Sequence, residues 1–110
     1  MKPGDIVLTI IPQDGQQKKR PVLILKILPK YNDYLVCAIS SQLHQYIPGF
    51  DLMLDDKHKA FKESSLNGPS VFRLSNLAVL SNKDIIGTIG FLRNDLHLIL
   101  LKNLANYLLS

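Results

Sequence analysis

The chain has 110 residues, 46% of them hydrophobic, and a formal net charge of +4. This length allows one domain over residues 1–110 with no room for a second, and the composition excludes a disordered chain. The N-terminal residues do not resemble a secretory signal, and no apolar stretch approaches the roughly 18 residues that span a bilayer. We therefore expect a cytoplasmic protein without membrane contact. The small basic excess favours encounters with polyanions but does not by itself indicate nucleic-acid binding.

The first forty residues predict three strands joined by short loops. The β-branched run Ile6–Ile11 ends at Pro12, and the polar connection Gln13–Gln17 carries an Asp-Gly turn signal. Further strands are expected at Pro21–Leu28 and Tyr34–Ile39. Because parallel neighbours would need a crossover of a dozen or more residues, we expect an antiparallel meander.

The middle of the chain predicts shorter strands around a charged stretch. These strands are expected at Phe50–Leu54, Ser70–Arg73, Leu77–Leu80 and Gly87–Phe91. We interpret Asp55–Gly68 as a mobile loop. Ser81 and Asp84 predict a capped turn, because the serine can accept from the amide three residues on while the acid reaches back. The whole pattern predicts five to seven short, mostly antiparallel strands around one core.

One helix is expected from Asn94 or Asp95 to the C-terminus. Its apolar residues recur at helical spacing: Leu96, Ile99, Leu100, Leu104, Tyr107 and Leu108. Four more widen the apolar arc: Leu98, Leu101, Ala105 and Leu109. Either this helix is sunk deeply into its own sheet, or part of the arc packs against another copy of the chain.

Polar residues border two of the predicted strands: Lys18, Lys19 and Arg20 precede one, and Ser40, Ser41 and Gln42 follow the other. If these strands pair as neighbours, Arg20 and Ser40 lie at one end of the same sheet. A planar guanidinium matches phosphate geometry, so the group suggests an RNA phosphate site. From the residues alone, Arg20 could also be a surface arginine beside an edge strand. Ser40 could equally be a strand-end hydroxyl bonded to a nearby backbone group.

Other reactive side chains point to little additional chemistry. Cys37 is the only cysteine, so it forms no internal disulfide, and we expect a buried, inert thiol. His44, His58 and His97 lack the spacing of a metal site, so no metal and no cofactor are expected. His44 lies near the proposed site, where it could act as a general acid or simply be a solvated loop residue.

Segments in order along nearly the whole chain resemble the MazF/PemK family of toxins from type II toxin-antitoxin systems. They are Gly4–Val7, Lys19–Ile24, Ala38–Gln42, Gly68–Arg73 and Ile89–Phe91, followed by the apolar helix. The resemblance implies a mainly β fold, a small SH3-like barrel with a C-terminal α-helix. It implies a homodimer and a metal-independent endoribonuclease that cuts single-stranded RNA at short sequences. It also implies a cognate antitoxin whose acidic, apolar tail occupies the RNA groove.

Metal-free RNA cleavage starts most readily when the ribose 2′-hydroxyl attacks the adjacent phosphorus, leaving a 2′,3′-cyclic phosphate and a 5′-hydroxyl. The enzyme must stabilise charge on the phosphoryl oxygens and manage two protons. Arg20 and Ser40 match family positions suited to the first task, and we expect them to be catalytic. The residues expected to bind RNA are Lys18, Lys19, Ser41, Gln42, Ser70 and Arg73.

The sequence departs from the family at the groups that would move protons. Gln16–Lys19 stands where some relatives place an acidic residue, and Ser75 replaces an acid that accompanies the residue matching Arg73 in PemK-type members. Either a loop group such as Asp14 contributes, or the enzyme works by electrostatics and positioning. The alternatives are a non-catalytic SH3-like barrel that binds RNA or peptide, and a regulatory dimer whose basic loop binds only an acidic protein tail.

Overall fold

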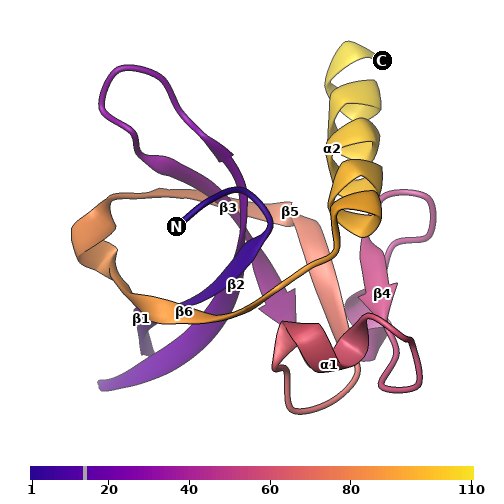
Figure 1. Cartoon of the computed structure of the whole chain (residues 1–110), viewed down its shortest axis with the longest axis horizontal. Coiled ribbons are helices and arrows are strands. Elements are labelled where there is room, and N and C mark those ends of the chain that lie inside the picture. Colours follow the sequence, from indigo (N-terminus) through magenta and orange to yellow (C-terminus); the bar gives the residue numbers. More distant parts are fainter. Residues whose placement is uncertain (14) are drawn as a thin grey trace.

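The computed structural model describes residues 1–13 and 15–110, which form one six-stranded antiparallel sheet and a C-terminal helix (Figure 1). The strands are β1 (Asp5–Gln13), β2 (Gln16–Ile27), β3 (Tyr34–Ser40), β4 (Leu52–Leu54), β5 (Ser70–Leu80) and β6 (Ile85–Phe91). The helices are α1 (Phe61–Ser64), α2 (Asn94–Leu109) and the single 3-10 turns η1 (Leu43–Gln45) and η2 (Asn82–Asp84). The strand order is β4-β5-β3-β2-β1-β6, so the predicted meander of the first three strands is confirmed.

The sheet curls into a small barrel, and its central strands are buried on both faces. One face of β2 packs with α2 through a large cluster that includes Leu23, Phe72 and Leu100. The opposite face contributes Val22 and Ile24 to a second, smaller cluster. Truncating such fully buried side chains to alanine typically costs about 2–5 kcal/mol. The predicted mainly β barrel with a C-terminal helix is therefore confirmed.

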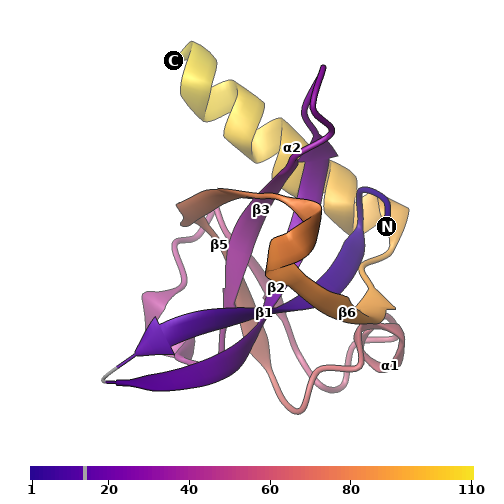
Figure 2. The ribbon, with the colours of Figure 1, turned by 90° about the vertical axis from the view of Figure 1, so that its left-hand side faces the viewer.

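The first two strands are longer than the sequence predicts. Pro12 does not end β1, which stays paired with β2 as far as Gln13. β6 pairs only with Asp5–Thr9, so Pro12 lies on a stretch with one neighbour, where its missing N–H is tolerated. β2 begins at Gln16 rather than Pro21, which places the basic residues inside the strand. The C-terminal end of β1 and the N-terminal end of β2 lie away from α2 (Figure 2).

The two strands expected at Ser70–Arg73 and Leu77–Leu80 are one continuous strand, β5. Its pairing with β3 jumps from Cys37–Leu77 to Ala38–Arg73, so the three residues between Arg73 and Leu77 form an irregularity within one strand. The capped turn at Ser81 and Asp84 is confirmed, since both hydrogen bonds of the capping box are present.

The stretch expected to be a loop at Asp55–Gly68 contains α1, which is anchored to β6. Ser64 is fully buried, and a Cβ atom on Gly90 would lie 2.5 Å from the carbonyl oxygens of Glu63 and Ser64. Only glycine allows the two backbones to approach so closely. The Arg93 guanidinium also forms an ion pair with Glu63. A helix of four residues without a side-chain cap leaves too little sequence pattern to predict.

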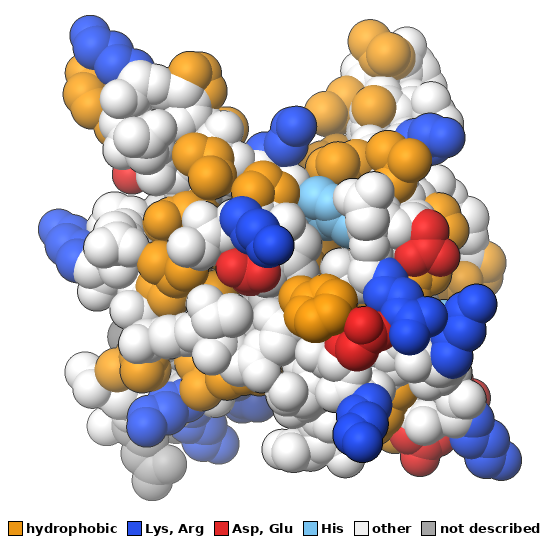
Figure 3. All heavy atoms as spheres, in the orientation of Figure 1, with side chains coloured by type: hydrophobic (Ala, Val, Ile, Leu, Met, Phe, Trp, Pro, Cys, Tyr) orange, Lys and Arg blue, Asp and Glu red, His pale blue; other side chains and the backbone are white. Residues whose placement is uncertain are grey.

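The expected C-terminal helix is confirmed, but it is not sunk deeply into the sheet. Leu96, Leu100 and Leu104 are buried, whereas Leu98 is 44% exposed and Leu108 is 71% exposed. Hydrophobic side chains accordingly appear on the surface over α2 (Figure 3, upper right). Among the described residues, no helix combines the length and apolar character needed to cross a membrane.

The single cysteine is buried, as predicted. Cys37 lies on β3 in the larger core cluster and is 0% exposed. Burial raises the pKa of its thiol to about 12, and the nearby Asp51 carboxylate adds to this shift. A thiol that stays protonated at neutral pH is a poor nucleophile.

Candidate functional site

Arg20 and Ser40 lie side by side across neighbouring strands. β2 pairs with β3 in antiparallel fashion so that Val22 is opposite Ala38. Arg20 lies two residues before Val22 and Ser40 two residues after Ala38, so both lie toward the same end of the strand pair. Side chains two residues apart on a strand share a face. Both residues line the same two cavities, so the structure brings them together as the sequence suggested.

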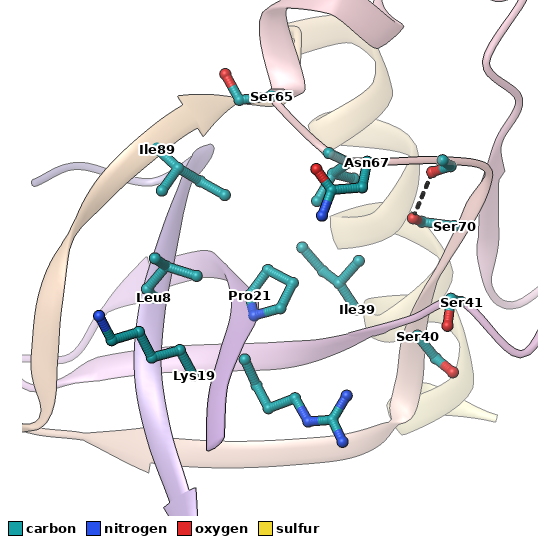
Figure 4. Close-up of a pocket in the computed structure, with 13 residues that line it drawn as sticks. Leu8, Lys19, Pro21, Ile39, Ser40, Ser41, Ser65, Asn67, Ser70 and Ile89 are labelled. Carbon is teal, nitrogen blue, oxygen red and sulfur yellow. Dashed lines mark hydrogen bonds between the residues drawn. The ribbon is translucent and has the colours of Figure 1, made fainter. Parts of the chain in front are cut away.

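The first cavity has a volume of about 310 Å³ and lies between the Arg20–Ser40 pair and the loop that follows α1 (Figure 4). Its apolar lining comes from four strands, through Leu8, Pro21, Ile39 and Ile89, and from Leu66 in the loop after α1. Its polar lining includes Lys19, Ser41, Ser65, Asn67 and Ser70. One wall is therefore suited to a flat apolar group and another to hydrogen bonds.

The second cavity, of about 470 Å³, lies on the other side of the same pair and is lined further by Gln42, Gln45, Arg73 and Asn76. Arg73 reaches it because β5 pairs Arg73 with Ala38 on β3. The Nε atom of Arg73 is buried and has no hydrogen-bond partner among the described residues. Buried donors are almost always paired, so such an atom is a natural place for a ligand oxygen.

The Ser40 hydroxyl is already engaged in hydrogen bonds within its own segment. It donates to the Oε1 atom of Gln45 at 2.8 Å and accepts from the backbone N–H of Gln42 at 3.0 Å. This geometry fixes the hydroxyl at the boundary between the two cavities. It also matches the local strand-end role that the sequence left open for Ser40.

The remaining residues expected to bind RNA are divided between the site and its surroundings. Lys19 and Ser70 line the first cavity, although the Ser70 hydroxyl donates to the carbonyl of Gly68 at 2.9 Å. Ser41 lines both cavities and Gln42 the second. Lys18 is exposed on β2 and lines neither.

The groups considered for proton transfer are not at these cavities. No Asp or Glu of the described residues lines either of them, and neither does His44 on η1. Asp14, named as a possible base, lies outside the described residues. Within those residues, no group of three His, Cys, Asp or Glu side chains could hold a metal ion.

Several site residues were missed from the sequence. Asn67 belongs to the stretch interpreted as a loop, and Gln45 lies on a single 3-10 turn, so neither carried a periodic signal. Asp51, which lines neither cavity, has a structural role that was also missed: its buried carboxylate accepts from the N–H groups of Ile47 and Leu74 at 3.0 Å each. Asp51 thereby ties the segment after η1 to β5. Only the three-dimensional contacts identify these roles.

Comparison with known proteins identifies the family to which this chain belongs. The solved structure of the Mycobacterium tuberculosis toxin MazF-mt6 has the same fold, with a TM-score of 0.65 and 24% sequence identity. The match covers 93% of this chain and 95% of that one. Residues 2–108 match the family model for the PemK-like, MazF-like toxin of type II toxin-antitoxin systems, so the chain belongs to this family. Its members are known as endoribonuclease toxins. A search of curated proteins found no match.

Proposed function

We propose that this protein is a sequence-specific, metal-independent endoribonuclease toxin acting on single-stranded RNA. The observation that carries the proposal is one cleft lined by Arg20, Ser40 and Arg73, in which the Nε atom of Arg73 is buried without a partner among the described residues. Two guanidinium groups and a hydroxyl converging on one space suit a phosphodiester and its flanking phosphate. Membership of the toxin family supports RNA as the substrate class.

The proposed reaction uses the RNA's own 2′-hydroxyl as nucleophile. The O2′–P bond forms and the P–O5′ bond breaks, which gives a 2′,3′-cyclic phosphate and a 5′-hydroxyl end. The 2′-hydroxyl loses a proton and the leaving O5′ gains one. Arg20 and Ser40 would donate to the phosphoryl oxygens as their charge grows, and one such donor is typically worth about 3–4 kcal/mol of barrier.

Ser40 must change its hydrogen-bond acceptor to take part. Its hydroxyl hydrogen now goes to Gln45, so a phosphoryl oxygen would replace Oε1 as acceptor. The bond from Gln42 N–H keeps the Ser40 oxygen in place during this exchange. No carboxylate of the described residues lines the cleft, so we assign the acceleration to charge stabilisation and positioning.

We also propose two protein partners. A cognate antitoxin would inhibit the toxin by laying an acidic segment along Lys19, Arg20 and Arg73, whose positive charges favour an anionic chain as much as RNA. A second copy of the chain would cover the exposed apolar groove between β5 and the C-terminal half of α2. That groove, of about 720 Å³, includes Leu77 and Leu108, which are 40% and 71% exposed.

A non-catalytic barrel that binds RNA or an acidic peptide is the second candidate. Two observations favour it: the Ser40 hydroxyl already donates a hydrogen bond to Gln45, and no carboxylate of the described residues lines the cavities to act as a base. The two functions separate when purified protein is incubated with a long unstructured RNA in EDTA. Fragments with cyclic-phosphate and 5′-hydroxyl ends support the ribonuclease. Intact RNA that is nonetheless bound would support the binding barrel.

A further inference from the structure

We infer that the 310 Å³ cavity beside Arg20 and Ser40 is a pocket for one nucleobase of the RNA, and that the Asn67 amide selects this base. The inference rests on the proposed ribonuclease function and adds to it a residue that sets the cleavage sequence.

The loop carrying Asn67 is fixed at both ends. On one side, the buried Ser64 hydroxyl oxygen accepts from Leu66 N–H at 3.2 Å, and Ser65 adopts a left-handed conformation with φ of 58°. On the other side, Ser70 donates to the carbonyl of Gly68 at 2.9 Å. The loop is therefore held in shape before any ligand binds, and such preorganisation lowers the entropic cost of recognition.

This loop is also fixed to the barrel through α1. The ion pair between Arg93 and Glu63 and the close approach of Gly90 to the carbonyls of Glu63 and Ser64 hold α1 against β6. Since α1 ends at Ser64, the following loop takes its position from these contacts. The cavity wall that Asn67 contributes is thus part of the rigid fold.

The Asn67 side chain points into the cavity, and its polar atoms are not used in hydrogen bonds to other described residues. Figure 4 shows it directed toward Pro21 and Ile39 from the opposite wall. Its amide makes no hydrogen bond to any other described residue, so its carbonyl oxygen and its NH₂ group are both available. Ser65 also lines the cavity.

The opposite wall suits the flat face of a base. Leu8, Pro21, Ile39 and Ile89 supply apolar surface there. An apolar surface with a few convergent polar groups is the usual form of a small-ligand site, and the volume lies at the lower end of the roughly 300–1,000 Å³ typical of such sites. Because Arg20 and Ser40 form one side of the pocket, its base belongs to a nucleotide adjoining the cleaved phosphate. Sequence-specific RNA readers commonly bind splayed-out bases in this way.

The chemistry of the amide gives a directional test. An asparagine side chain presents an acceptor oxygen and an NH₂ group with two N–H donors, whereas an ionised aspartate presents acceptors only. On its Watson–Crick edge, guanine alone offers two adjacent N–H donors, at N1 and N2. Asn67→Asp should therefore shift the preferred base in this pocket toward guanine, and Asn67→Ala should weaken preference at that position without favouring another base.

The experiment maps the cleavage sites of four proteins on one long unstructured RNA: the parent, Asn67→Asp, Asn67→Ala and Asn82→Asp. Asn82 is exposed on η2 and lines neither cavity, so its variant repeats the charge change elsewhere. We expect discrimination at one nucleotide beside the cut to fall at least about tenfold in Asn67→Ala. In Asn67→Asp we expect the preferred base at this nucleotide to change toward guanine, while Asn82→Asp keeps the cleavage pattern of the parent.

The possible failures are distinguishable. If all four proteins cut at the same sites with the same preferences, the base pocket is wrong and the ribonuclease stands. If the parent leaves RNA intact, both are wrong. Should Asn67→Asp repel RNA too strongly to cut, Asn67→Ala still decides the question, because an unchanged preference in that folded variant excludes Asn67 as the selecting residue.

Discussion

The hydroxyl of Ser40 donates to the side-chain oxygen of Gln45, 2.8 Å away, on the boundary between the two cavities. In the proposed reaction, a phosphoryl oxygen takes the place of Gln45 as the acceptor. The same hydrogen bond would be expected if Ser40 only stabilised the end of β3. The two roles differ in how cleavage responds to removing each partner.

Ser40→Ala should lower the single-turnover cleavage rate about a hundredfold to a thousandfold, the usual loss for one preorganised donor to a phosphoryl or acyl oxygen. Gln45→Ala should stay within a few-fold of the parent, because Gln45 is the partner that Ser40 gives up. Urea unfolding of both variants provides the control for stability. If the two substitutions reduce cleavage equally, Ser40 is a structural hydroxyl.

Arg73→Ala should weaken RNA binding mainly through charge, because its unpartnered Nε is proposed to face a phosphate. For single-stranded nucleic acid, each neutralised phosphate contributes about 0.7 to the slope of log Kd against log salt concentration. The slope measured with uncleavable 2′-O-methyl RNA should therefore fall by about 0.7. Lys83→Ala removes the same charge from exposed η2 and should leave the slope unchanged. Equal slopes for all three proteins would exclude a phosphate contact by Arg73.

Leu108→Glu should dissociate the proposed dimer. Leu108 lines the apolar groove beside Tyr107, whose ring lies 5.2 Å from that of Phe50. Because Leu108 is largely exposed, its substitution should cost the monomer little folding stability. Burying a leucine is worth about 1.5–3 kcal/mol, so the dissociation constant should rise at least tenfold in light scattering. Leu98→Glu is the matched control, because Leu98 is also exposed on α2 but does not line the groove. A monomeric parent, or loss of the dimer only in Leu98→Glu, would contradict this interface.

His97 should make the fold less stable at mildly acidic pH. Burial lowers the pKa of His97 below the usual 6.5, and the positive charge of Lys26 adds to this shift. The hydrogen bond between Nε2 and the carbonyl oxygen of Leu25, 3.0 Å away, opposes the shift only in part. The unfolded chain then binds more protons than the folded one, so stability falls as the pH drops below about 6.5. Backbone hydrogen bonds lower the pKa of Asp55 and Asp84 below 3.8, so their contribution is lost only in more acidic solution.

Urea unfolding between pH 5 and 8 checks the role of His97. The parent should lose stability toward pH 5, and His97→Gln, which keeps a side-chain donor but cannot titrate, should show a flatter profile. An identical pH dependence in the two proteins would assign the acid sensitivity to another group.

The sequence was sufficient to predict the elements with strong local patterns. The central strands are continuous apolar runs, and α2 repeats its leucines at helical spacing, so their type followed directly. The juxtaposition of Arg20 with Ser40 also followed, because adjacent antiparallel strands with a short connection have few possible registers. Elements with weaker sequence patterns were predicted less accurately. The sequence predicted separate strands at Ser70–Arg73 and Leu77–Leu80, although pairing with β3 joins them into the single strand β5.

The cavity wall that carries Asn67 could not be predicted from the sequence, because tertiary contacts position it. α1 and the loop with Asn67 depend on Gly90 and on the ion pair of Arg93 with Glu63, residues roughly thirty positions apart in sequence. Nothing in the local pattern of Asp55–Gly68 indicates those contacts. The exposure of Leu108 is likewise invisible to periodicity, which counts apolar residues but does not show how much of a helix its own sheet can cover.

The central claim is tested most directly by the single-turnover cleavage rate of Arg20→Ala in EDTA on an unstructured RNA, measured beside the parent and Lys83→Ala. We predict that the parent and Lys83→Ala give the same fragments with cyclic-phosphate and 5′-hydroxyl ends at similar rates. Arg20→Ala, measured at a temperature where its urea unfolding curve shows that it is folded, should be slower by about a hundredfold or more. Cleavage by Arg20→Ala at the parent rate would contradict the account, because Arg20 would then have no part in stabilising the transition state.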